Sequence, residues 1–217
     1  MDLTTYQTDG FFDEVFDDDG KPRSLATALT DRLECLHDGE IQRRQRDAEY
    51  AMFQSGTTFS VYGNQEATER IIPFDVIPRI IEAETWKHVE AGLKQRIQAL
   101  NLFLGDVYGN ADIIKEGIIP AEFVLLDNPT FMKCVGLSPP RGIWCHISGI
   151  DLVRDGEGGF YVLEDNLRCP SGVSYVLENR RILKQTFPQL FETHSIRPIE
   201  DYAERLLACS SILRPIP

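Results

Sequence analysis

The sequence predicts an α+β fold with a mainly antiparallel sheet, a central β-hairpin and flanking helices. Apolar residues from Trp86 to Leu104 recur at helical spacing, which indicates one amphipathic helix over residues 82–108. Residues 144–153 and 160–166 are apolar stretches joined by the glycine-rich turn RDGEGG, a pattern typical of a β-hairpin. The chain shows no internal repeat and no low-complexity tract.

The remaining elements follow from hydrophobic periodicity and from glycine and proline breakers. Residues 1–22 are acidic and contain such breakers, so we expect an irregular segment there. Leucines at helical spacing after Ser24, a residue that can cap a helix, predict a helix over 24–54. The other predicted elements are a strand over 57–63, an extended, turn-rich stretch over 69–78, a short helix over 110–116, a strand or turn over 123–126, and helices over 174–187 and 199–213.

Composition excludes several classes of protein. The chain has 217 residues and a formal net charge of −12, which argues against a general binder of nucleic acid or of anionic membranes. No apolar run approaches the roughly 20 residues that span a bilayer, and the first residues lack the pattern of a signal peptide. The 5 cysteines are scattered without a C-x-x-C motif. We therefore expect reduced thiols and a cytoplasmic location.

Polar residues end the predicted hairpin in an unusual way. An apolar strand from Tyr161, expected to be buried, leads directly into Glu164, Asp165 and Asn166, with Arg168 shortly after. Because side chains alternate along a strand, Glu164, Asn166 and Arg168 share one face and Asp165 points to the other.

The loop length decides where Asp151 lies. An even loop centred on Gly156 and Glu157 pairs Asp151 with Val162, which brings Asp151 onto the face of Glu164. An odd loop turns Asp151 away from that face.

Two carboxylates and an amide oxygen on one face form a site for a hard cation. Asp151, Glu164 and Asn166 are therefore predicted to bind Mg²⁺ or Mn²⁺. Arg168 suits an anion such as phosphate, and the backbone N–H groups of Ser171 and Gly172 can face the same anion. The alternative is that these charges only protect an edge strand, with Arg168 neutralising Glu164 and Asp165.

The segment GIDLVRDGEGGFYVLEDNLRCPSGVSYVLENRR, which contains these residues, resembles the signature of the circularly permuted type 2 ATP-grasp proteins. This family is related to the synthetase domain of glutathionylspermidine synthetase. The upstream segments TTFSVYG, ERIIPFDVIPRII and GLKQRIQALNLFLGDVY match the same family, so the resemblance runs from about Asp13 to the C-terminus.

The resemblance implies ATP-dependent ligation of a small-molecule carboxylate to an amine through an acyl phosphate, with Mg²⁺ and ATP as cofactors. It implies that Asp151, Glu164 and Asn166 are the metal ligands and that Arg168 is the catalytic residue facing the transferred phosphoryl group. Other residues lie in family-typical blocks without an assigned role: Asp75, Arg79, Gln95, Arg96, Asn101, Asn179 and Arg180. For Gln95, Arg96 and Asn101 the alternative is ordinary polar packing on a helix.

The sequence also departs from the family pattern. Family members are roughly twice as long, and their metal-binding half precedes the half that clamps the nucleotide. No G-x-x-x-x-G-K-[ST] loop is present. We therefore expect an acidic segment over 1–22 and, over 23–217, the N-terminal metal-binding portion of the domain, truncated before the nucleotide clamp and weakly active or inactive alone.

Two other functions remain open from the sequence. One is a non-catalytic binding module that uses the acidic face to bind a partner subunit, either a separate C-terminal half or another protein. A large exposed apolar surface near the C-terminal helix would favour this function. The other is a metal-dependent hydrolase that uses the same carboxylates, for which the sequence offers no positioned base.

Overall fold

The computed structural model describes residues 3, 5–61, 68–125 and 133–211, and within it the chain divides into two units. Unit 1 contains Met1–Thr85, Leu152–Leu163 and Ser171–Glu200, and unit 2 contains Trp86–Asp151, Glu164–Pro170 and Asp201–Pro217. The β-hairpin therefore contributes its loop end to unit 1 and its open end to unit 2. In the described ranges no helix is long and apolar enough to cross a membrane.

The helices of unit 1 are α1 (Thr27–Glu34), α2 (Glu40–Gln54), α7 (Val173–Thr186) and α8 (Pro188–Thr193). The prediction of one helix over 24–54 was wrong, because the chain breaks at Gly39 into α1 and α2. Gly39 has φ of 77°, a left-handed conformation that only glycine adopts at little cost. The helix predicted over 174–187 is confirmed as α7.

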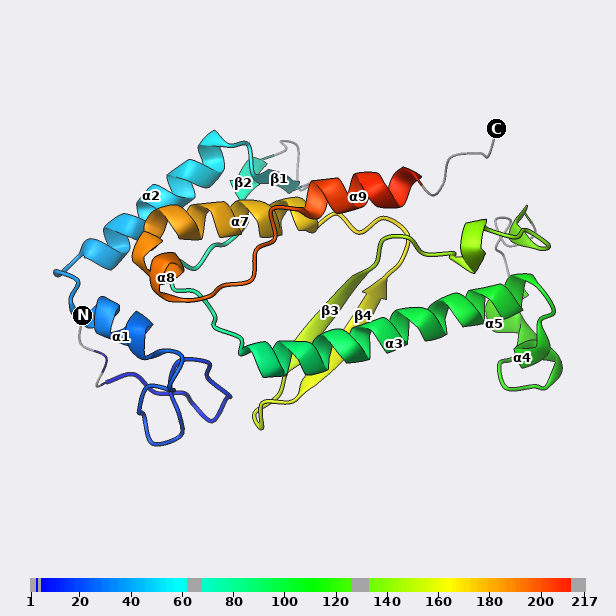
Figure 1. Ribbon diagram of the computed structural model, residues 1–217, viewed down its shortest axis with the longest axis horizontal. Coiled ribbons are helices and arrows are strands. Elements are labelled where there is room, and N and C mark those ends of the chain that lie inside the picture. The colour runs from blue at the N-terminus through cyan, green and yellow to red at the C-terminus, as the bar shows by residue number, and fades with distance from the viewer. Residues whose placement is uncertain (1–2, 4, 62–67, 126–132, 212–217) are drawn as a thin grey trace. The chain divides into compact units, whose positions relative to one another are not determined.

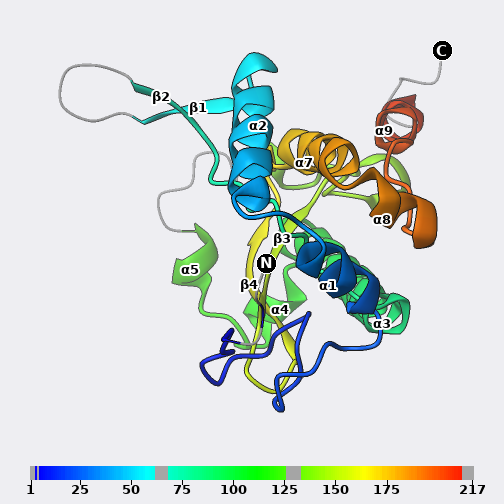
Figure 2. The ribbon, with the colours of Figure 1, turned by 90° about the vertical axis from the view of Figure 1, so that its left-hand side faces the viewer.

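The core of unit 1 has two apolar clusters. The first joins α1, α8 and the segment before α3, and its fully buried members are Leu29, Leu33, Leu36, Val76, Phe187 and Leu190. The second joins α2 to α7 through Ala48, Met52 and Ile182. Figures 1 and 2 both show α2 running beside α7, as this cluster requires. Burial of these side chains supplies the main stabilisation of unit 1.

The strands β1 (Thr58–Val61) and β2 (Thr68–Ile71) form an antiparallel pair. Thr58 lies opposite Ile71, and Val61 lies opposite Thr68. This confirms the strand predicted over 57–63 as far as residue 61, and the last two predicted positions lie outside the described residues. The stretch predicted as extended and turn-rich begins within β2 and continues without regular structure to α3.

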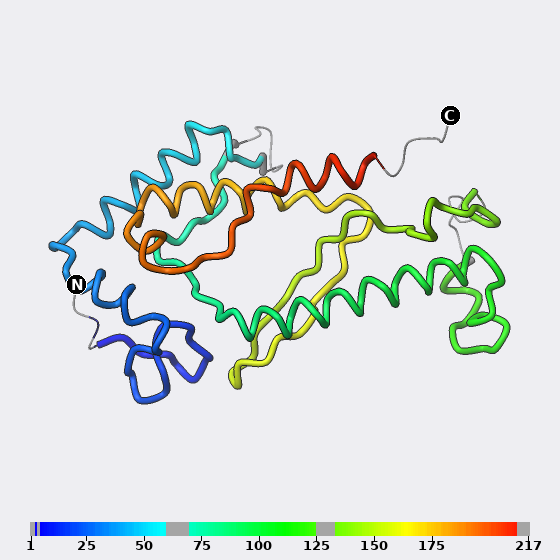
Figure 3. Tube along the Cα trace, viewed as in Figure 1, coloured from blue at the N-terminus to red at the C-terminus, as the bar shows by residue number. Residues whose placement is uncertain are grey.

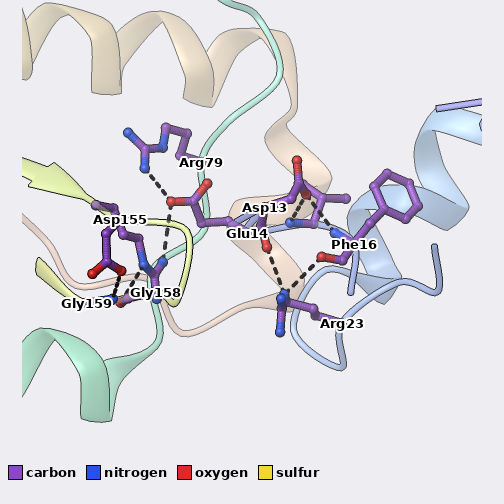
Figure 4. Close-up of polar contacts among 10 residues, drawn as sticks. Asp13, Glu14, Phe16, Arg23, Arg79, Asp155, Gly158 and Gly159 are labelled. Atoms are coloured by element: carbon purple, nitrogen blue, oxygen red, sulfur yellow. Dashed lines mark hydrogen bonds and ion pairs between the residues drawn. The ribbon is translucent and has the colours of Figure 1, made fainter. Parts of the chain in front are cut away.

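The acidic N-terminal segment is held in unit 1 by charged contacts (Figure 4). The Glu14 carboxylate accepts hydrogen bonds from Arg79 and from Arg154, whose Nη1 lies 3.3 Å away. The Arg154 guanidinium also lies over the Phe12 ring at 3.8 Å and over the Phe160 ring at 4.7 Å. Phe12 and Glu14 thus tie this segment to the loop end of the hairpin.

Unit 2 contains most of α3 (Ala83–Tyr108), whose trace runs unbroken in Figure 3. Its other described elements are α4 (Asp112–Lys115), α5 (Ala121–Leu125), the 3-10 helix η1 (Pro140–Gly142), the open end of the hairpin and α9 (Tyr202–Ser211). The helices predicted over 82–108 and 110–116 are confirmed. The strand or turn predicted over 123–126 is wrong: residues 121–125 form α5, with Pro120 just before its first residue.

The hairpin consists of β3 (Gly149–Arg154) and β4 (Phe160–Asn166) in a two-stranded sheet. The antiparallel α+β fold class is therefore confirmed. The first strand begins five residues later than the predicted Trp144, since the backbone N–H groups of Trp144 and Cys145 bind the Asn101 side chain instead of a neighbouring strand. The expected burial of Tyr161 is wrong as well, because 60% of that residue is exposed.

Candidate functional site

The hairpin loop has an odd number of residues, which is the case expected to turn Asp151 away from Glu164. The Asp155 N–H donates to the Gly159 carbonyl at 2.9 Å, and the Gly158 N–H donates to the Asp155 carbonyl at 3.1 Å. Gly158 has φ of 90°, as the closing position of a three-residue loop requires. Counting along both strands from this pair would place Asp151 opposite Leu163, on the face away from Glu164.

The open end of the hairpin follows a different count. A β-carbon built on Gly149 would lie 3.6 Å from the Asn166 β-carbon, so these residues are direct neighbours on one face. Counting residue pairs from Gly149 and Asn166 toward the loop places Asp151 opposite Glu164. The two counts differ by one residue, which is the effect of a β-bulge.

Solvent exposure locates this extra residue in β4. Exposed and half-buried residues alternate along β4 until Leu163 and Glu164, which are adjacent and both exposed. After that point Asn166 is exposed and Asp165 is half-buried. We infer that a bulge at Leu163–Glu164 brings Glu164 and Asn166 onto the exposed face that carries Asp151.

Glu164 and Asn166 have the spacing of neighbouring ligands of one cation. The Asn166 amide donates to the Glu164 carboxylate, with Nδ2 and Oε1 2.8 Å apart. Adjacent ligands in octahedral Mg²⁺ coordination lie about 2.9 Å apart, given metal–oxygen distances of about 2.1 Å. Turning the Asn166 amide by half a turn would present its oxygen at that spacing. The residues therefore fit Mg²⁺, although the metal ligation remains a prediction.

The described part of the chain contains no group of three His, Cys, Asp or Glu side chains arranged around a possible metal position. The candidate set differs in composition, because it has two carboxylates and one amide. Such a set leaves several octahedral positions for water and phosphate oxygens, as is usual for Mg²⁺ bound with a nucleotide.

Asp165 points to the opposite face and is bound by Arg96 of α3. The Arg96 Nε lies 2.8 Å from Oδ1 and 3.0 Å from Oδ2 of Asp165, and its Nη2 lies 2.6 Å from Oδ2. These hydrogen bonds from Arg96 lower the pKa of the Asp165 carboxyl, so Asp165 stays charged. Neutralisation of Asp165 by Arg168, the alternative from the sequence, is thus wrong.

Arg168 is exposed and makes no hydrogen bond or ion pair with any residue that the structure describes. Its guanidinium is therefore available to an anion. Ser171 and Gly172 directly precede α7, and Gly172 is the N-cap of this helix. Backbone N–H groups at a helix N-terminus suit an anion. The role of these three residues in binding phosphate remains a prediction.

Asn101, also on α3, positions the chain before β3. Its Oδ1 accepts hydrogen bonds from the backbone N–H groups of Trp144 at 2.7 Å and Cys145 at 3.0 Å. From the sequence, the alternative role of Asn101 and Arg96 was ordinary polar packing on a helix. No local pattern links Arg96 to a carboxylate 69 positions away, so only their place in family-typical blocks marked them.

Two other residues of the family-typical blocks, Arg79 and Arg180, have hydrogen-bond partners within unit 1. Arg79 binds Glu14, and Arg180 donates to the Arg197 carbonyl at 2.9 Å. The Asn179 Oδ1 is buried and has no hydrogen-bond partner among the described residues.

The exposed face of the hairpin carries two carboxylates and an amide, and the exposed Arg168 follows Asn166 by two residues. These residues define a candidate site for a divalent cation with an anionic ligand. The family model of the circularly permuted ATP-grasp type 2 proteins matches residues 78–214. The chain belongs to this family, as its resemblance predicted.

Relatives of the chain include longer proteins from several bacteria. An uncharacterized protein of Synechocystis is 47% identical over 99% of this chain and 45% of its own length. One of Mycobacterium leprae is 42% identical over 90% of this chain and 34% of its own length. A Frankia casuarinae protein with the provisional name glutamate–cysteine ligase is 39% identical over 87% of this chain and 21% of its own length. The chain thus spans less than half the length of these relatives.

Proposed function

We propose that this chain is the metal-binding portion of an ATP-dependent ligase that joins a carboxylate to an amine. Membership of the ATP-grasp family supports this class of reaction. The observation that carries the proposal is the pair Glu164 and Asn166, held 2.8 Å apart on an exposed face. This distance is that of an ordinary hydrogen bond, and it is also compatible with two neighbouring oxygen ligands of Mg²⁺.

In this reaction a carboxylate oxygen takes the γ-phosphoryl group of ATP, with release of ADP, and forms an acyl phosphate. The amine nitrogen then bonds to the acyl carbon, phosphate leaves and the amine loses a proton. Both steps move negative charge onto phosphate oxygens, so a site of this kind needs fixed positive charge around them. Bound Mg²⁺ supplies part of that charge.

We assign roles to the residues on this basis. Asp151, Glu164 and Asn166 hold Mg²⁺ by oxygen atoms, and the exposed Arg168, which has no partner among the described residues, binds a phosphoryl oxygen. A guanidinium offers paired donors to phosphate, so Arg168 suits this position better than a lysine would. The N–H groups of Ser171 and Gly172 contribute further donors at the start of α7.

The substrates that we propose are a small-molecule carboxylate and a small-molecule amine. Proteins of Frankia casuarinae and Frankia alni that are 39% and 41% identical to the chain have provisional names as glutamate–cysteine ligases, whose chemistry is amide-bond formation. The chain covers 21% of each, so their names support the class of reaction and leave the substrate open.

The test is a calorimetric titration of the chain with Mg²⁺ and a non-hydrolysable ATP analogue. We expect Mg²⁺-dependent binding that is lost in the double variant Glu164→Ala, Asn166→Ala. Glu157→Ala is the matched control, because it removes an exposed carboxylate from the loop of the same hairpin. Equal binding by the double variant, or no binding by the wild type, would refute the proposed site.

A second candidate function rests on α9. Leu207 is 67% exposed and Leu206 is 39% exposed on this helix, which is the apolar surface expected of a non-catalytic docking module. Its partner would be the part of the longer relatives that lies outside the shared region. Binding of that purified part from the Synechocystis relative, lost in Leu207→Asp, together with no nucleotide binding by the chain alone, would favour this function.

A further inference from the structure

We propose that Arg96 is a positioning residue for the magnesium site, acting through Asp165. The inference rests on the proposed function, because it concerns the same site. Arg96 touches neither the proposed metal nor the nucleotide. It holds the residue between the two ligands Glu164 and Asn166 and so decides which way they point.

The contact between Arg96 and Asp165 is a fork on a carboxylate. Three nitrogen–oxygen distances of 2.6 to 3.0 Å involve two nitrogens of Arg96 and both oxygens of Asp165. The Asp165 side chain is only 15% exposed, whereas that of Arg96 is 44% exposed. Such paired contacts fix the orientation of both side chains, which a single contact does not.

Fixing Asp165 also fixes its neighbours. Successive side chains of a strand point to opposite faces, so an Asp165 held on the α3 side directs Glu164 and Asn166 to the exposed side. This support is needed here, because the inferred bulge interrupts the hydrogen-bond ladder just before Asp165. The sheet has two strands, so no third strand holds β4 in this part of the structure.

Arg96 also balances the negative charge of Asp165 next to the site. Asp165 is a third carboxylate next to Asp151 and Glu164, and unpaired it would repel them or compete for the metal. Paired with Arg96, its charge is balanced on the opposite face. The oxygen ligands of the exposed face can then be Asp151, Glu164 and Asn166 alone.

One helix holds both strands of the site. Arg96 binds the end of β4, and Asn101 binds the chain before β3 through two backbone N–H groups. Both belong to the 26-residue helix α3, which is a rigid support over this distance. By contrast, Lys94 forms its ion pair with Glu90 of the same helix.

The experiment compares Arg96→Ala and Arg96→Lys with the control Lys94→Ala. Hydrogen–deuterium exchange of the ligand-free chain measures how firmly residues 164–168 are held. Titration with Mn²⁺ and the ATP analogue measures the site itself. In Arg96→Ala we expect exchange at residues 164–168 to rise about tenfold or more and Mn²⁺ affinity to fall about tenfold to a hundredfold, as for other outer residues of metal sites.

Arg96→Lys should show exchange rates and Mn²⁺ affinity between those of the wild type and Arg96→Ala, because lysine keeps the positive charge but cannot donate two parallel hydrogen bonds to the carboxylate. Lys94→Ala should match the wild type in both measurements. If Arg96→Ala fails to fold, Arg96→Lys carries the test by its affinity for Mn²⁺.

The outcomes separate the inference from the proposed function. Wild-type Mn²⁺ affinity in both Arg96 variants overturns the inference and leaves the proposed function intact. Equal loss of exchange protection over the whole of unit 2 also overturns it, because that is general destabilisation. A wild-type chain that binds no Mn²⁺ overturns both, since no site then exists to be positioned.

Discussion

Replacing Glu14 by glutamine should destabilise unit 1 because it leaves Arg154 without its counter-charge. The side chains of Glu14 and Arg154 are only 10% and 12% exposed, and their atoms are 3.3 Å apart. Arg79, which shares the same carboxylate, is 67% exposed and can be solvated by water instead. The loss therefore falls on Arg154.

The expected loss of stability is about 3 kcal/mol, at the lower end of the range for breaking a buried ion pair. The lower end applies because Arg154 keeps its hydrogen bond to the Gly158 carbonyl at 3.0 Å and its contacts with the Phe12 and Phe160 rings. With urea slopes of about 1.5 to 3 kcal/mol per molar, this loss lowers the unfolding midpoint by about 1 to 2 M.

The assay is urea unfolding followed by circular dichroism at 222 nm. Asp47→Asn is the control, because Asp47 pairs with Arg43 at 3.2 Å and is 66% exposed. This variant should lose about 0.5 kcal/mol or less. A loss below about 1 kcal/mol in Glu14→Gln would refute the reasoning, because it would mean that Arg154 is solvated or paired without Glu14.

Three further predictions address other contacts. Asn101→Ala should cost about 2 kcal/mol in urea unfolding because two backbone N–H groups lose their acceptor, and Asn101→Asp, which keeps an acceptor, should lose less. Gly149→Ala should lower the free energy of unfolding by about 1 to 3 kcal/mol, because its new β-carbon would lie 2.8 Å from a proline β-carbon. The control Gly92→Ala in α3, where the new β-carbon would meet open space, should raise it by about 0.5 to 1 kcal/mol in the same assay. The hydrogen bond from Lys184 lowers the pKa of Glu200 from 4.5 to about 2. The melting temperature of the wild type should therefore exceed that of Glu200→Gln fully above pH 4.5, and this difference should disappear as the pH falls toward 2. A difference that stays constant down to pH 2 would contradict this assignment.

Elements whose sequence signals lie within a few residues of each other were predicted correctly. The apolar stripe of α3 and the glycine-rich turn of the hairpin are signals within a few residues of each other, and both elements formed as predicted. The break at Gly39 was missed because the leucine spacing continues on its N-terminal side and arginines and glutamates, good helix formers, follow it. The conformation of α5 was missed because a four-residue apolar run suits either a strand or a helix.

Only part of the candidate site could be predicted from the sequence. The residue types and their spacing at Glu164 and Asn166 were enough to suggest a cation site. Contacts between distant parts of the chain were not predictable, because that of Arg96 with Asp165 beside the site spans 69 positions and that of Arg154 with Glu14 in unit 1 spans 140. The sequence left the parity of the hairpin loop open, and the bulge that offsets the odd loop has no sequence signal that we recognised.

This offset shows how β4 can lose one residue and keep the proposed site. Between the loop pair Asp155–Gly159 and the pair Gly149–Asn166, β4 contains one residue more than β3. Deleting Leu163 would remove the bulge and place Glu164 opposite Asp151 in a regular ladder, so Glu164 and Asn166 would stay on the exposed face. Versions of this hairpin without the bulge can therefore retain all the proposed ligands on one face, whereas the loss of one further residue from this stretch of β4 would turn Glu164 and Asn166 to the other face.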